Sequence, residues 1–267
     1  MELNAHRLEE LEGLSLDKAC DYMELHCEKH MVGCINWPAV ASYQPICAFT
    51  IAYGAKHIYV AFTTTGQDLR AINTANLSAV SQDSCVEFFM QVPGSKEYWN
   101  FEFNCIGAVN ASHRETRPCP VRLNDEQIES IERYSSVGYE PFAERGGLHT
   151  WRLAVAIPFA LIGIGPDTPY IMGNFYKCAD KTAHPHYLSW APIHMEKPNF
   201  HCPEFFGRIN LLWLKTARQG SGALPITLNV IGIYKSGATL VDNLRREYLN
   251  KKTFSINFTK EYKILIF

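Results

Sequence analysis

Short alternating runs of apolar and polar residues recur along most of this chain, and turn residues separate them. Runs of this length, bounded by Gly, Pro, Asn or Asp, are typical of β-strands that bury one face. Many short strands with only one or two small helices favour an all-β, jelly-roll-like β-sandwich over an alternating α/β fold. The predicted strands are 47–53, 57–63, 84–91, 98–105, 150–157, 170–178, 187–191 and 206–213.

Two segments have helical patterns. The first is 16–30, with Ser15 as a capping residue, and the second is 124–134, where Asn124 and Gln127 occupy capping-box positions. The chain therefore divides into an N-terminal helical lead-in (1–30), a sandwich (31–213) and a C-terminal extension (214–267) with a Gly-Ser-Gly linker at 220–222. That extension fits an added β-α-β element or a poorly ordered tail.

Composition excludes several classes of protein. With 47% hydrophobic and 19% charged residues the chain is globular, and a net charge of −2 argues against general nucleic-acid binding. No apolar run is long enough to span a membrane. The nine cysteines form no CxxC pair, which is typical of reduced thiols, and the N-terminus shows no secretory signal, so we expect a cytoplasmic protein.

The hairpin formed by 84–91 and 98–105 is the first candidate site. A four-residue loop at 93–96 places Glu87 directly across from Glu102, and like charges in such a pair are destabilising unless something uses them. A ligand rich in hydroxyl donors is one such use, because carboxyl oxygens are strong acceptors. A solvated outer face is the alternative. The polar face carries Cys85, Glu87, Phe89, Asn100, Glu102 and Asn104, and the core face carries Val86, Phe88, Met90, Trp99, Phe101 and Phe103.

A second polar concentration lies between residues 174 and 201. Aromatic rings beside amides and charged groups suit a sugar, whose C–H face stacks on a ring while polar groups hold its hydroxyls. A loop-rich end of the sandwich with core aromatics is the alternative. The segment holds Asn174, Tyr176, Lys177, Asp180, Lys181, His184, His186, Tyr187, Trp190, His194, Phe200 and His201.

Ordered motifs along 35–213 resemble the carbohydrate-binding family 9-like proteins. They include Ile-Asn-Trp-Pro at 35–38, Gln-Asp-Ser-Cys-Val-Glu-Phe-Phe at 82–89, Asn-Phe-Glu-Phe-Asn-Cys-Ile-Gly at 100–107 and Phe-His-Cys-Pro-Glu-Phe-Phe-Gly at 200–207. The resemblance implies a β-sandwich that binds sugar on one sheet and is associated with glycan-degrading enzymes. In the best-understood branch two tryptophans clamp the sugar, and a Glu, an Arg and an Asn hold its hydroxyls.

Those roles carry over only in part. The Glu of the family corresponds to Glu87, while the Arg position falls on Glu102 and the Asn position near Lys197. The two Trp positions fall on Ser81 and Phe200. We expect Lys177 to compensate for the missing Arg, and Trp190 or Trp37 to compensate for the missing aromatic ring.

We therefore expect non-catalytic binding of a mono- or oligosaccharide, in glycan breakdown beside separate enzymes, with no cofactor. Truncating Trp99, Phe101 or Trp151 in the core is expected to cost about 3–5 kcal/mol. The expected ligand-binding residues are Glu87, Asn100, Glu102, Asn104, Lys177, Trp190 and Phe200.

Three alternatives remain from the sequence. Glu87 and Glu102 fit a glycosidase pair, and a module without its tryptophan and arginine fits a protein-interaction domain. The third alternative is a zinc site formed by Cys178, His184, His186, His194, His201 and Cys202. A calcium site formed by Asp and backbone oxygens would leave no recognisable sequence pattern.

Overall fold

Residues 1–213 are described by a computed structural model, and the expected C-terminal extension lies outside them. They are mostly β, as the sequence predicts, with three short α-helices: α1 (Leu16–His26), α2 (Asp125–Glu129) and α3 (Phe159–Ile162). Three 3-10 turns lie at Glu9–Gly13, Val80–Gln82 and Pro203–Phe205. The strands are β1 (Glu2–Arg7), β2 (His30–Met31), β3 (Cys34–Ile35), β4 (Ile46–Tyr53), β5 (His57–Ala71), β6 (Cys85–Gln91), β7 (Tyr98–Asn104), β8 (Val109–Arg114), β9 (Val121–Arg122), β10 (Glu132–Ser135), β11 (Phe142–Pro158), β12 (Tyr170–Cys178), β13 (Tyr187–Ser189) and β14 (Gly207–Leu212).

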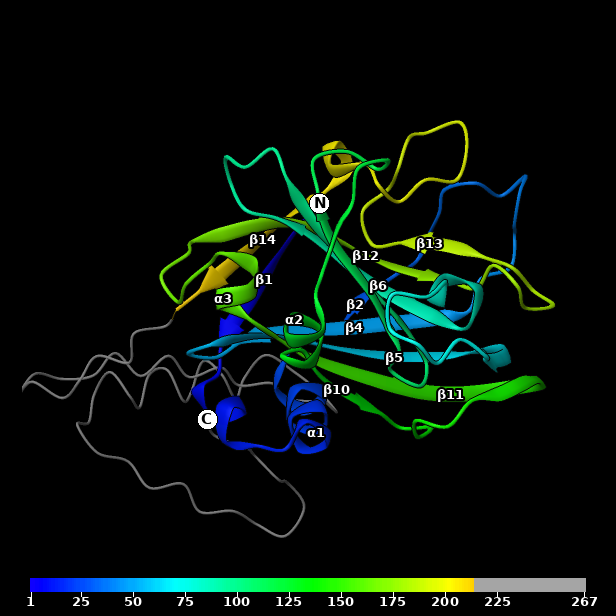
Figure 1. The fold of residues 1–267 in the computed structure, drawn as a ribbon, viewed down its shortest axis with the longest axis horizontal. Helices are drawn as coiled ribbons and strands as arrows, with labels where there is room; N and C mark the ends of the chain where they lie inside the picture. The colour runs from blue at the N-terminus through cyan, green and yellow to red at the C-terminus, as the bar shows by residue number, and fades with distance from the viewer. Residues whose placement is uncertain (214–267) are drawn as a thin grey trace, which may run out of the picture. The chain divides into compact units, whose positions relative to one another are not determined.

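The strands form one curled mixed sheet whose two halves face each other (Figure 1). One half contains β10, β11, β5 and β4, and the other contains β14, β12, β6, β7, β8 and β9. Strand β1 joins them, because it pairs in parallel with both β4 and β14. The predicted N-terminal lead-in thus holds a strand of the sheet as well as α1, which packs under β4, β5 and β11.

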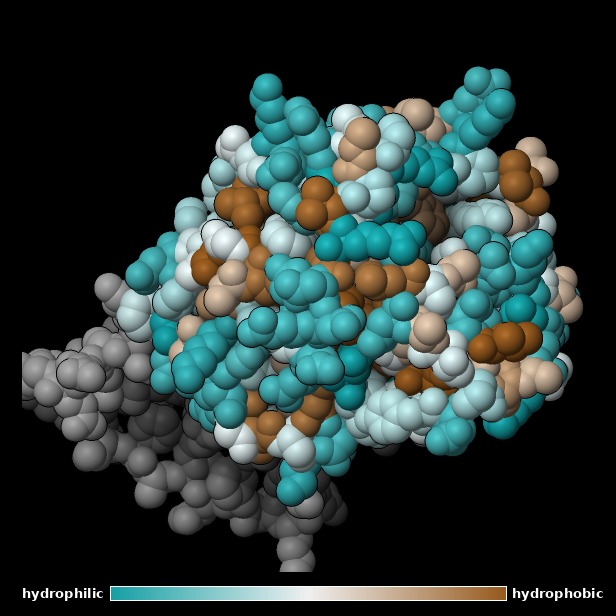
Figure 2. All heavy atoms as spheres, viewed as in Figure 1, coloured by the Kyte–Doolittle hydropathy of each residue, from teal (hydrophilic) through white to brown (hydrophobic). Residues whose placement is uncertain are grey.

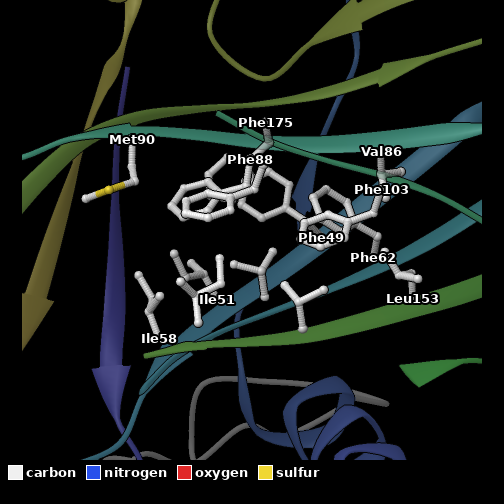
Figure 3. Close-up of a cluster of buried hydrophobic side chains, with 14 of the residues drawn as sticks. Phe49, Ile51, Ile58, Phe62, Val86, Phe88, Met90, Phe103, Leu153 and Phe175 are labelled. Atoms are coloured by element: carbon white, nitrogen blue, oxygen red, sulfur yellow. The ribbon is translucent and has the colours of Figure 1, made fainter. Parts of the chain in front are cut away.

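The main core fills the space between the two halves (Figure 3). From one half come Phe88, Met90 and Phe175, and from the other Ile51 and Leu153, all of them buried. Of the core tryptophans expected above, Trp151 is buried, but Trp99 is half-buried and stacks on His113 with 4.6 Å between ring centroids. The full effect predicted for truncating a buried ring therefore applies to Trp151 and Phe101 and not to Trp99.

The helix predicted over 124–134 is shorter in the structure. Asn124 and Gln127 form the expected capping box, but α2 ends at Glu129. The following residues form β10, which pairs with β11. Strand pairing at the sheet edge therefore overrides the local helical pattern.

Hydrophilic side chains spread across the face shown in Figure 2, and hydrophobic ones gather there in separate small groups. Within the described part of the chain, no helix has the length and apolar character required to cross a membrane.

Candidate functional site

Hairpin β6–β7 has the register that the sequence predicts. Glu87 lies directly opposite Glu102. On the other side of β6, strand β12 places Tyr176 opposite Glu87 and Cys178 opposite Cys85. Since side chains alternate between the two faces of a strand, all five project from the face that points away from the main core.

This face is largely covered, and a cavity of about 130 Å³ that opens to solvent lies on it. The side chains of Glu87 and Glu102 are only 3% and 8% exposed. The alternative interpretation of the sequence, in which this face is solvated, is therefore wrong. The cavity is lined by Ser81, Glu87, Glu102, Arg117, Cys178, Asp180, Tyr187, Pro198, Asn199, Phe200 and His201.

Glu102 is held in place by two amides. Its carboxyl oxygens accept hydrogen bonds from Asn100 Nδ2 at 2.9 Å and from Asn110 Nδ2 at 3.0 Å. Asn100 is itself fixed, because its Oδ1 accepts a 2.6 Å hydrogen bond from Ser112 Oγ. Burial raises the pKa of Glu102, and Asn110, Arg114 and Asn100 oppose that rise. Asn100 therefore orients Glu102 from behind and does not line the cavity itself.

Glu87 has much weaker partners. Its Oε1 accepts from the thiols of Cys178 at 3.2 Å and Cys85 at 3.9 Å, and thiols are poor donors. Burial first, and then the neighbouring Cys178 and Glu102, raise the pKa of Glu87 well above its usual range. A carboxyl group with this environment has acceptor capacity left for a ligand.

The raised pKa of Glu87 predicts that stability falls as pH rises. Above the ordinary value of 4.5 the unfolded chain has released this proton while the folded chain still holds it. In that window each pH unit removes about 1.4 kcal/mol from the free energy of unfolding, up to the folded pKa. Glu87→Gln cannot ionise, so the variant should show a flatter pH dependence in urea unfolding above about pH 5. Equal slopes in the two proteins would contradict the assignment.

Phe200 supplies an aromatic ring to the cavity. It stacks on Tyr176 with ring centroids 4.2 Å apart and an interplanar angle of 11°, and Tyr176 Oη donates to the Phe200 carbonyl at 3.1 Å. The positions onto which the resemblance carries two tryptophans, a glutamate and an arginine thus meet at one cavity: Ser81, Phe200, Glu87 and Glu102.

Besides Asn100, three more of the expected ligand-binding residues do not reach this cavity. Lys177 points to the opposite face of β12, because its neighbours Tyr176 and Cys178 project from the face that carries the cavity. Its Nζ donates a 2.8 Å hydrogen bond to the Cys178 carbonyl and lies 2.8 Å from His186 Nε2. Trp190 packs edge-on against Phe49 in the main core. Asn104 instead donates to the Asn73 carbonyl and to Asp83.

Arg117 and Asn199 line the cavity although the sequence did not single them out. Arg117 lies in the loop between β8 and β9, and its carbonyl accepts a 2.8 Å hydrogen bond from Arg114. Neither residue belongs to a periodic pattern that would have revealed it. Asp180, Tyr187 and His201 did fall within the polar segment noted above, but spacing alone could not place them.

Three of the four histidines considered for zinc have other partners. His186 contacts Lys177, His201 Nδ1 lies 3.1 Å from Tyr98 Oη, and His184 contacts Asp68. Burial lowers the pKa of His186 to about 2 and that of His201 to about 3, so both are neutral. Within residues 1–213, Cys178 instead meets Cys85 and Glu87 as a group of metal-ligand side chains.

Comparisons with known proteins identify the family of this chain. The model of the family described as carbohydrate-binding family 9 matches residues 16–211. A solved structure of a candidate carbohydrate-binding protein from Bacteroides uniformis is 30% identical, with a TM-score of 0.76, covering 79% of this chain and 99% of the other.

Two structures of a family 9 carbohydrate-binding module from Caldicellulosiruptor kristjanssonii share the fold. The complex with cellotriose has a TM-score of 0.54 at 13% identity and covers 85% of this chain and 99% of the other. The complex with glucose has a TM-score of 0.55 at 12% identity and covers 84% and 100%. No curated protein matches the chain. The family match over 16–211 and the 30% identical structure show that the chain belongs to carbohydrate-binding family 9.

Proposed function

We propose that the cavity beside β6, β7 and β12 binds one ring of a mono- or oligosaccharide without catalysing a reaction on it. The observation that carries this proposal is the pair of buried carboxyl groups, Glu87 and Glu102, at the wall of a cavity in a family 9 fold. Such oxygens can accept hydrogen bonds from sugar hydroxyls.

The other lining residues suit the same ligand. Arg117 and Asn199 offer N–H donors, and Phe200 offers a ring against which an apolar sugar face can pack. Arg117 takes the cationic role that the sequence assigned to Lys177. Drug-sized ligands occupy pockets of about 300–1,000 Å³, so a cavity of about 130 Å³ suits a single ring.

A role in glycan breakdown, beside a separate hydrolase, is the setting that we propose for this binding. Its support is the family membership and the cellotriose held by the Caldicellulosiruptor module. The protein-interaction alternative would be favoured by a pocket filled with the protein's own side chains or with its C-terminal tail. The side chains of residues 1–213 leave space in the cavity, and the tail lies outside these residues.

Calorimetric titration of the full chain against glucose, xylose, cello- and xylo-oligosaccharides and host-type oligosaccharides tests the proposal. We expect saturable binding of at least one member at a single site. Absence of heat across the whole panel would contradict the proposed function and favour a module that serves protein interaction.

A further inference from the structure

Two thiols and a carboxyl group converge at the wall of the cavity. The ligand atoms of Cys85, Glu87 and Cys178 all lie within 4.8 Å of one another. All three side chains are buried, and Glu87 and Cys178 line the cavity. Thiolate and carboxylate groups in such a cluster are ligands for borderline or soft divalent metals.

Strand pairing brings the three residues together. Cys85 and Cys178 are directly opposite each other on the antiparallel strands β6 and β12. Glu87 lies two residues along β6 and therefore on the same face. Their placement on two central strands, and not on loops, makes the geometry rigid enough for a defined coordination site.

The distances match tetrahedral coordination. Zn–S bonds of about 2.3 Å and Zn–O bonds of about 2.0 Å at a tetrahedral angle separate the sulfur and oxygen by about 3.5 Å. Glu87 Oε1 lies 3.2 Å from Cys178 Sγ and 3.9 Å from Cys85 Sγ. An ion bound to Glu87 and to either sulfur would thus need only small shifts of these side chains, and the two sulfurs lie within 4.8 Å of each other.

We propose that Cys85, Glu87 and Cys178 bind a zinc-class divalent cation, with the fourth coordination position turned toward the cavity. Three protein ligands and one open position are the arrangement in which zinc accepts water or a ligand oxygen. Glu87 makes its hydrogen bonds within residues 1–213 only to these two thiols, so this buried carboxyl group lacks a strong partner that a cation would supply.

The charges around the cluster favour a bound cation. Two thiolates and a carboxylate carry three negative charges, of which a divalent ion offsets two. Lys177, adjacent to Cys178 in sequence and buried on the other face of β12, adds a positive charge beside the cluster. Thiols bind a metal as thiolates, so binding must displace their protons and should strengthen as pH rises.

Cobalt(II) titration of the reduced, metal-free full chain tests this site, because Co²⁺ bound to thiolates absorbs in the near ultraviolet. We expect the sulfur-to-cobalt band to saturate at a single equivalent and to disappear when Zn²⁺ is added. Cys85→Ala and Cys178→Ala should each lose most of the band. Cys47→Ala, which removes a buried thiol that lies outside this cluster, should retain it.

Two results would overturn the proposal: no stoichiometric Co²⁺ or Zn²⁺ binding by the wild-type chain, or a band that persists in both Cys85→Ala and Cys178→Ala. Near-ultraviolet circular dichroism of each variant separates a lost site from a lost fold. The readout involves no sugar, so its failure leaves the proposed carbohydrate binding untouched, and the reverse also holds.

Discussion

Glu87→Ala is expected to weaken sugar binding by at least about a hundredfold, which for a weak ligand amounts to complete loss. The variant removes both carboxyl oxygens from the cavity wall. The sugar hydroxyls that donate hydrogen bonds to these oxygens are then left without partners. Each sugar hydroxyl left unpaired against the cavity wall costs about 1–3 kcal/mol, and two of them account for the expected loss. Calorimetric titration with the panel sugar that binds wild-type protein measures the change.

The fold should survive this substitution because Glu87 faces the cavity and not the main core. Glu97→Ala is the matched control: Glu97 is exposed just before β7 and contacts His113, away from the cavity. It should bind sugar as wild type does. Wild-type affinity in folded Glu87→Ala protein would place the site elsewhere.

Phe175→Ala is expected to lower the free energy of unfolding by about 3–5 kcal/mol. Phe175 is fully buried and connects the two halves of the sheet. Its ring stacks on Phe49 from β4, with centroids 3.6 Å apart, and on Phe88 from β6, at 4.9 Å. Truncation removes both contacts and leaves a cavity that the surrounding strands cannot close.

Urea unfolding followed by fluorescence and circular dichroism measures this loss. Leu148→Ala is the control, because that side chain is 75% exposed and its truncation should change the free energy of unfolding by less than about 0.5 kcal/mol. A change below about 1 kcal/mol in Phe175→Ala would show that Phe175 does not hold the two halves together.

The sequence predicts the hairpin and its register because one local count determines both. A short loop at 93–96 and alternation along two strands place Glu87 opposite Glu102, and the structure confirms the pairing. Strand β12 was predicted over its full length for the same reason. Strand β1 was missed although Leu3 and Ala5 alternate with polar residues, because its partners β4 and β14 are distant in sequence.

The site was only partly predictable, and the reason is geometric. Alternation along β12 was sufficient to show that Lys177 faces away from Tyr176 and Cys178. The polar character of the segment instead suggested that Lys177 belongs to the binding site. Arg117 and Asn199 come from loops, whose path over the sheet follows from tertiary packing and not from local pattern. Glu87 and Phe200 were identified through the hairpin register and the family resemblance.

A crystal structure of the full chain grown with the panel sugar that binds most strongly is the most direct test of the proposed site. We predict one sugar ring in the cavity, with its hydroxyls donating to Glu87 and Glu102 and one face near Phe200. A sugar bound on another surface, with the cavity between β6, β7 and the loop at 198–201 unoccupied, would contradict this account.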